Sequence, residues 1–379
     1  MQDVNELATR LRGYLGSDPS NFEIACELAD LYLSEGRVAA AKAVLDGLPP
    51  AAQAAAGVQA RLGRMALLRG DYAAAESVFE ALAGSGHASE GVLHDLAFAQ
   101  LCQREIDRAD ATITSAIGLH GLTPALGVLK ARIAMMRDDT TTAIATLDAV
   151  LQVAPGHAEA LGVKALALFD GDRMEEAAAV AAECLKQHPR QHEALLVAGT
   201  LMLWAQRADE AARLFETALD VQPNSGRVLS GYGQVLMLKD RLPDAQRILE
   251  RAVRAMPDHI GTWHALAWAQ LLQGEQNAAE GSYRAAYDLD RNFGDTHGGL
   301  ALIAVLRGQY ADAEQDVKRA LRLDPNAFTA KYAHALLLEA RGDEAGSDAL
   351  MRELVQGTGS PIPIREFNAK LKTILRARA

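Results

Sequence analysis

A small residue, Gly or Ala, recurs every 34 residues through almost the whole chain. The ten sites of this first row are Ala29, Gly63, Ala97, Ala131, Ala165, Gly199, Gly233, Ala267, Ala301 and Ala335. A second row follows twelve residues behind the first, with alanine from Ala41 to Ala313 and Ser347 at its end. A fixed period of this length is typical of stacked helical repeats, because a residue without bulk lets neighbouring helices lie close together.

The period divides the chain once each first-row site is numbered position 8 of its repeat. Ten repeats then occupy residues 22–361, between a predicted N-terminal capping helix over 1–21 and a predicted C-terminal capping helix over 362–379. The repeats start near residues 22, 56, 90, 124, 158, 192, 226, 260, 294 and 328. In each repeat we expect a helix A over about positions 1–14 and a helix B over about positions 17–30.

The turn between the two helices carries glycine in six repeats, at residues 36, 70, 171, 274, 308 and 342. We expect these glycines to adopt the positive φ that ends helix A. An aspartate directly follows three of them, at Asp71, Asp172 and Asp343, where its side chain is placed to cap helix B. Proline at 155, 189, 223, 257 and 325 marks the end of helix B in the same phase.

The repeats that begin at Ile260 and Gly294 carry the residues by which a known family is identified. These are Trp263, Leu266, Ala267, Ala279, Tyr283, Ala286, Leu300, Ala301, Gly308, Tyr310, Ala313, Ala320 and Pro325. The pattern resembles the tetratricopeptide repeat (TPR) family. The resemblance implies an all-α fold, a right-handed α-solenoid superhelix of about ten helix-turn-helix units, whose concave groove holds protein or peptide segments.

Composition excludes several classes of function. A net charge of −11 argues against neutralising the phosphates of a nucleic acid, so we expect no nucleic-acid partner. We see no signal peptide and no membrane span, which predicts a cytoplasmic protein. The three cysteines are too far apart for a metal or redox pair, and no catalytic or phosphate-binding motif is present. We therefore expect no cofactor, no metal and no enzymatic activity.

The groove, by the TPR resemblance, is lined by positions 2, 5, 9 and 13 of helix A. Position 9 varies where the small rows are uniform, and it carries aromatic rings at Phe98 and Trp268. Each ring has a histidine one turn earlier, His94 and His264. Two alternatives are open: the rings anchor a ligand, as exposed aromatics often do at interfaces, or they fill gaps between helices.

Arginine occupies position 9 at Arg64 and Arg132. These side chains either hold carboxylates of an acidic or C-terminal segment or pair within the protein. Position 5 never carries Lys and position 9 never carries Asn, so binding of a heat-shock chaperone tail is disfavoured. The remaining candidates for the groove are Leu166, Trp204, Gln234 and Leu302. The groove is expected to be charged from Asp30 to Arg132 and apolar from Trp204 to Leu302.

These observations favour a non-catalytic scaffold or adaptor that binds a protein or peptide segment. The alanine-rich repeats resemble bacterial TPR proteins that serve in secretion, pilus or envelope assembly. Two alternatives stay open: a self-assembling structural subunit, and a regulatory partner of an enzyme on another chain. The oligomeric state is not determined by the sequence.

Overall fold

The computed structural model describes residues 2–356 and the side chains of residues 5–354. The predicted C-terminal capping helix over 362–379 lies outside this range. The chain divides into two compact units, Met1–Arg173 and Met174–Ala379. All the regular secondary structure of the described residues is helical, so the prediction of an all-α helical-repeat fold is confirmed.

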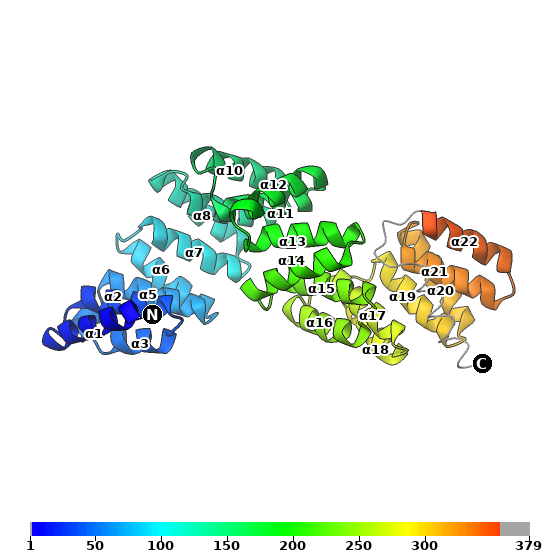
Figure 1. Ribbon diagram of the computed structural model, residues 1–379, viewed down its shortest axis with the longest axis horizontal. Coiled ribbons are helices and arrows are strands. Elements are labelled where there is room, and N and C mark those ends of the chain that lie inside the picture. The colour runs from blue at the N-terminus through cyan, green and yellow to red at the C-terminus, as the bar shows by residue number, and fades with distance from the viewer. Residues whose placement is uncertain (1, 357–379) are drawn as a thin grey trace. The chain divides into compact units, whose positions relative to one another are not determined.

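The N-terminal unit consists of helical hairpins that follow one another along the chain (Figure 1). Its helices are α1 (Gln2–Ser17), α2 (Phe22–Ser34), α3 (Val38–Asp46), α4 (Pro50–Gln53), α5 (Ala56–Leu68), α6 (Tyr72–Gly84), α7 (Glu90–Cys102), α8 (Ile106–His120), α9 (Pro124–Met135), α10 (Thr140–Val153) and α11 (Ala158–Asp170). The short α4 follows Pro49, where the proline pair ends helix B early.

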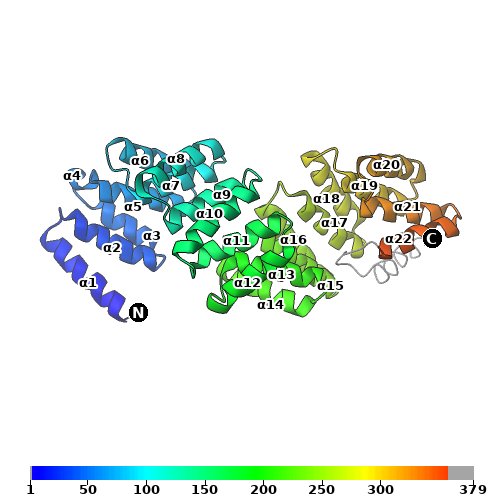
Figure 2. The same cartoon turned by 90° about the horizontal axis from the view of Figure 1, so that it is seen from above.

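The C-terminal unit has the same organisation, seen from a second side in Figure 2. Its helices are α12 (Met174–Gln187), α13 (His192–Trp204), α14 (Ala208–Val221), α15 (Gly226–Leu238), α16 (Leu242–Ala255), α17 (Ile260–Leu272), α18 (Gln276–Leu289), α19 (Gly294–Leu306), α20 (Tyr310–Leu323), α21 (Phe328–Ala340) and α22 (Glu344–Gln356). In both units the odd-numbered helices from α5 on are helices A and the even-numbered ones are helices B.

The first row of small residues lies where helix A meets its own helix B. A Cβ added to Gly63 would come within 2.7 Å of the ring of Phe79, and one added to Gly199 within 2.7 Å of the ring of Phe215. The alanines of the row, such as Ala97, are fully buried. Glycine therefore stands in these repeats because a ring fills the space that a methyl group occupies elsewhere.

The turn between helices A and B differs from the prediction in one repeat. Position 15 has a positive φ in every repeat, at glycine in five and at Arg104, Asp138, Asp172, Gln206 and Asp240 in the others. Gly171 is at position 14, and its φ is −92°, so the prediction for this glycine was wrong. Asp172, which was expected to cap helix B, is instead the residue with the positive φ in this turn. The other two predicted capping aspartates, Asp71 and Asp343, each accept a hydrogen bond from a backbone N–H as expected.

Helix α1 packs on α2 through buried Ala8 and Leu11. Two other apolar side chains of this helix, Leu7 and Tyr14, are exposed, so its apolar residues are only partly buried.

Helices α19 and α21 pack unusually closely, and they lie side by side in both views (Figures 1 and 2). A Cβ on Gly298 would lie 2.4 Å from the backbone nitrogen of Ala330, so the absence of a side chain sets the distance between these helices. This contact decides how the groove residues of the C-terminal unit are covered.

Candidate functional site

The helix-A face of the N-terminal unit carries ion pairs between neighbouring repeats. Asp30 on α2 accepts hydrogen bonds from Arg61 on α5, with Nε–Oδ1 and Nη2–Oδ2 distances of 2.9 and 2.5 Å. Arg61 also donates to the carbonyl of Gly57, which stands one turn earlier and has no side chain to block the guanidinium. The charges predicted for this part of the face are present, and they are joined to one another.

A second ion pair involves Arg64, one of the predicted ligand-binding arginines. Its Nε lies 2.7 Å from Oδ2 of Asp95 on α7, and Nδ1 of His94 lies 3.1 Å from the other carboxylate oxygen. Burial would raise the pKa of Asp95, but the hydrogen bonds from His94 and Arg64 outweigh it and hold that pKa below its usual value. Arg64 is therefore paired within the protein.

Arg132 is paired in the same way, with Nη2 3.1 Å from Oε1 of Glu159 on α11. Of the two alternatives for the predicted arginines, intramolecular pairing describes both. A ligand carboxylate would have to compete with Asp95 or Glu159 for them.

Phe98 lies on α7, one turn after Asp95 of the first ion pair and one helix A before Arg132 of the second. Its side chain is 37 % exposed, which leaves part of the ring open to solvent. Helices α5 and α9 both contact α7; Leu68 at the end of α5 is 65 % exposed, and Met136 directly after α9 is 45 % exposed. We use the name apolar patch for Phe98 at position 9 together with Leu68 and Met136 at position 13, the large exposed apolar residues at groove positions of three successive repeats.

Leu166, the last candidate in this unit, is buried at 9 % exposure in α11. It contributes mainly to packing.

Trp268 and Leu302 are buried in the core of the C-terminal unit. Trp268 is 7 % exposed and Leu302 is fully buried, and both belong to one hydrophobic cluster with Tyr332. The rings of Trp268 and Tyr332 meet edge to face with centroids 6.3 Å apart. Packing, the second alternative for the aromatic rings, describes Trp268.

His264 is held in the same region. Its Nε2 lies 2.8 Å from Oγ1 of Thr296, and its ring meets Tyr283 and Phe293 edge to face. Burial lowers the pKa of His264 to about 4, so the ring is neutral at physiological pH. A neutral histidine with one nitrogen engaged in this way acts as a packing and hydrogen-bonding residue.

Two candidates of the C-terminal unit are less covered. Trp204, at the end of α13, is 44 % exposed. Gln234 is half-buried on α15 and donates to the carbonyl of Ser230 on its own helix.

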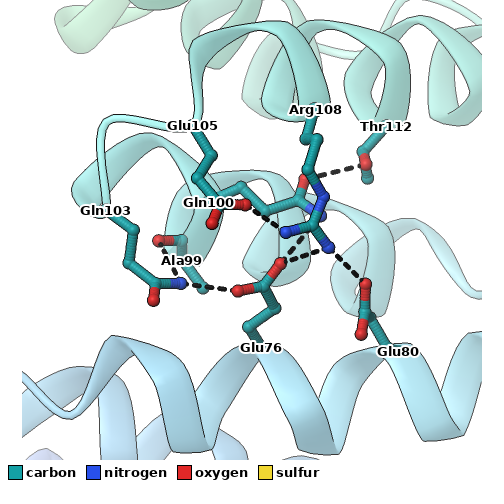
Figure 3. A network of polar contacts seen from close by, with 8 residues as sticks. All are labelled: Glu76, Glu80, Ala99, Gln100, Gln103, Glu105, Arg108 and Thr112. Atoms are coloured by element: carbon teal, nitrogen blue, oxygen red, sulfur yellow. Dashed lines mark hydrogen bonds and ion pairs between the residues drawn. The ribbon is translucent and has the colours of Figure 1, made fainter.

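A polar network that the sequence analysis missed surrounds Glu76 on α6 (Figure 3). Glu76 is only 8 % exposed; its Oε2 accepts from Nε2 of Gln103 at 2.6 Å, and its Oε1 accepts from Gln100 and pairs with Arg108. Gln100 in turn accepts from the hydroxyl of Thr112. Both carboxylate oxygens are engaged, so the network holds neighbouring repeats together and offers little to a ligand.

The Gln103–Glu76 contact recurs between other repeats, always across 27 residues. It joins Arg137 to Asp110, Gln273 to Gln246, Arg307 to Glu280 and Arg341 to Glu314. We call these five contacts the rungs. Each rung runs from position 14 of a helix A to position 21 of the helix B before it. The signal that could have revealed them is a hydrogen-bond donor at position 14 of one repeat and an acceptor at position 21 of the preceding repeat, 27 residues earlier.

Within the described residues, no group of three or more His, Cys, Asp or Glu side chains is arranged to hold a metal ion. None of the described helices is long and apolar enough to cross a membrane.

Comparison with known proteins gives matches to one family. Tetratricopeptide repeat models match residues 8–62 and 202–269, and residues 128–192 and 299–361. A comparison with curated proteins gives no match.

Two similar solved structures are a human IFIT1 dimer with m7Gppp-AAAA and a chain of the APC/C hetero-tetramer Cut9-Hcn1. The first shares 14 % identity at a TM-score of 0.53, over 93 % of this chain and 94 % of that chain. The second shares 14 % identity at a TM-score of 0.52, over 99 % and 81 %. At such identity the likeness concerns the fold alone. The family matches and the 34-residue period of the sequence show that the chain belongs to the tetratricopeptide repeat family.

Proposed function

We propose that the protein is a non-catalytic scaffold that binds a protein segment on the helix-A face of its N-terminal unit. The observation that carries the proposal is the partly exposed ring of Phe98, which stands between ion pairs that are already closed. A ring in this setting offers apolar area at a small cost in conformational entropy, and aromatic side chains often dominate the binding energy of an interface.

The proposed ligand is a segment with an apolar side chain that covers the apolar patch of Phe98, Leu68 and Met136. Its polar groups would lie over the Arg64–Asp95 and Arg132–Glu159 pairs, which present both signs of charge. Because those pairs stay intact, we expect modest salt dependence and binding that depends mainly on apolar contact.

As the setting of this scaffold we propose a bacterial process of secretion, pilus or envelope assembly, with the protein in the cytoplasm. This part of the proposal rests on the alanine-rich repeats. A net charge of −11 supports a protein rather than a nucleic-acid ligand.

The experiment is a pull-down from lysate of the source organism, followed by calorimetry with the partner segment that it identifies. Wild type is compared with Phe98→Ala and with a matched control, Leu119→Ala. Leu119 is an exposed apolar residue, at 65 %, on helix B α8. We expect Phe98→Ala to weaken binding by about 2 kcal/mol, roughly thirtyfold, and Leu119→Ala to change it less than twofold.

Equal binding by the three proteins would refute the proposed face. Circular dichroism melts must first show that both variants fold as the wild type does. Recovery of an enzyme as the main partner would support the regulatory alternative instead, and an RNA in the eluate would contradict the exclusion of nucleic acid.

A further inference from the structure

A polar cleft lies among helices α18, α19 and α20 of the C-terminal unit. Its volume is about 360 Å³, and its walls come from helix B of one repeat, α18, and from both helices of the next. None of its residues belongs to the helix-A face proposed above to bind a protein segment, so the two sites are independent.

The floor of this cleft holds an unsatisfied histidine. His297 on α19 is 2 % exposed, and its Nε2 lies 2.9 Å from the backbone oxygen of Arg291. A carbonyl only accepts, so Nε2 carries the proton and, in the neutral ring, Nδ1 is an acceptor. Nδ1 is buried and has no hydrogen-bond partner among the described residues. An unpaired buried acceptor is costly, and such a group calls for a donor.

A carboxylate, which is a second acceptor, stands near this nitrogen. Oδ1 of Asp316 on α20 lies 4.0 Å from Nδ1 of His297, too far for a hydrogen bond. Asp312 lines the cleft one turn earlier on the same helix. Neither carboxylate accepts a hydrogen bond within the part of the chain that the structure describes. One end of the cleft thus gathers Nδ1 of His297 and two carboxylates that accept no hydrogen bond from a described residue, and Gln309 and Arg319 also belong to the lining.

The basic side chains around the cleft do not meet this need. Arg284 and Arg307 both bind the carboxylate of Glu280, through contacts of 2.6 to 2.9 Å, so their charge is directed to that residue. Burial raises the pKa of Asp316 and outweighs the lowering by His297 and by Arg319, which is exposed on α20. The side chain of Asp316 is 36 % exposed and accepts no hydrogen bond from a described residue.

Apart from Gln309, the rest of the lining is mainly apolar and suits an alkyl chain. Leu300, Ile303 and Ala304 of α19 contribute to the wall next to His297. The ring of Tyr287 stands edge to face with His297, with centroids 5.5 Å apart and planes at 88°. An apolar wall that leads to a cluster of acceptors matches a chain that ends in a protonated amine.

We propose that this cleft binds an alkylammonium group, such as a lysine side chain of a partner protein. The ammonium would donate to Nδ1 of His297 and to the carboxylate of Asp316, with Asp312 adding negative charge, and the alkyl stem would lie along Leu300 and Ile303. The polar pair is local to this repeat: where His297 and Asp316 stand, the preceding repeat has Trp263 and Ser282 and the following one Lys331 and Leu350.

The test is an NMR titration of the full chain with N-acetyl-lysine amide, following the imidazole Cε1–H signal of His297. The signal is assigned by its loss in His297→Gln. We expect a saturable shift with a Kd on the order of 1–10 mM, as befits a single side chain. N-acetyl-norleucine amide keeps the alkyl chain without the ammonium and should give no saturable shift.

Two variants keep the test decisive. Asp316→Asn, which preserves shape, should weaken binding at least fivefold. Glu314→Gln is the matched control, because Glu314 lies on the same helix but pairs with Lys318 and Arg341 outside the cleft. The proposal is overturned if norleucine amide binds as well as lysine amide, if Asp316→Asn has no effect, or if N-acetyl-glutamate amide binds in preference and thereby assigns the cleft to an anion.

Discussion

The close approach of α19 and α21 predicts opposite effects for two glycine-to-alanine changes in neighbouring helices. In Gly298→Ala the new Cβ would lie 2.4 Å from the backbone nitrogen of Ala330, 2.8 Å from its Cα and 2.9 Å from the carbonyl carbon of Thr329. In Gly281→Ala, on α18, the new Cβ would meet no atom within 4 Å. Both glycines are inside helices, so alanine improves helix propensity equally in the two variants.

The magnitudes follow from these distances. Ordinary contacts are about 3.5–4.0 Å, so α21 must move by about 1 Å to accept the methyl group at Gly298. The obstacle is backbone, which cannot rotate away as a side chain can. Overpacking of this kind costs about 1–3 kcal/mol, against a gain of about 1 kcal/mol from helix propensity. We expect Gly281→Ala to stabilise by about 0.5–1 kcal/mol and Gly298→Ala to destabilise by about 2 kcal/mol.

Urea unfolding followed by far-UV circular dichroism measures the difference, with amide hydrogen exchange in α21 as the local readout. A gain of stability in Gly281→Ala with faster exchange of α21 in Gly298→Ala is the expected pair of results. If Gly298→Ala proves as stable as Gly281→Ala, the helices are not in backbone contact and the burial of Trp268 needs another explanation.

Four further substitutions test other contacts. Burial lowers the pKa of His264 in the folded chain from 6.5 to about 4, so the unfolded chain takes up the proton first as the pH falls. The free energy of unfolding should be at its full value above pH 6.5 and fall by about 3 kcal/mol as the pH drops to 4. Urea titrations at several pH values should show a smaller fall in His264→Gln. The hydroxyl of Tyr283 is buried without a partner among the described residues, so Tyr283→Phe should raise the free energy of unfolding by about 1 kcal/mol. A loss of stability would show that the hydroxyl is satisfied. Asp138 has a φ of 57°, so Asp138→Gly should stabilise the protein by about 0.5 kcal/mol. Asp139 caps α10, so Asp139→Ala should destabilise it by about 1 kcal/mol. Thermal melts that rank the two variants in reverse would contradict this assignment of the turn.

The repeat architecture could be predicted because its signal is steric and local. A small residue every 34 positions is needed wherever helix A meets helix B, and Gly63 against Phe79 shows the constraint directly. The turn was less predictable, since glycine is favoured at a positive φ but is not required there. Asp138 and Asp172 adopt the left-handed conformation as well, so counting glycines placed Gly171 at the wrong position.

The rungs were missed for a different reason. Each partner alone is an ordinary polar residue on a helix surface, and only the spacing of 27 residues connects them. The same spacing also accounts for two of the gaps: Gly171 follows Ile144, and Ala205 follows Ala178, at the positions that would form a rung. Neither of these pairs has the polar groups that the contact requires.

The exposure of the groove residues at position 9 depends on contacts with the next two repeats, which the pattern of a single repeat does not reveal. Phe98 and Trp268 share position 9 and are each preceded by a histidine, yet one is 37 % exposed and the other 7 %. For Trp268, position 5 of the next repeat is Gly298, which lets α21 come close, and position 5 of the repeat after that is Tyr332, whose ring meets the indole.

For Phe98 the corresponding two residues are Val128 and Gly162. A valine in the next helix A cannot allow the backbone approach that Gly298 permits, and a glycine two repeats on supplies no ring to cover the phenyl group. The difference in exposure between Trp268 and Phe98 thus follows the residues at position 5 of the two following repeats. This is the physical reason for assigning the proposed binding face to Phe98 and for treating Trp268 as part of the core.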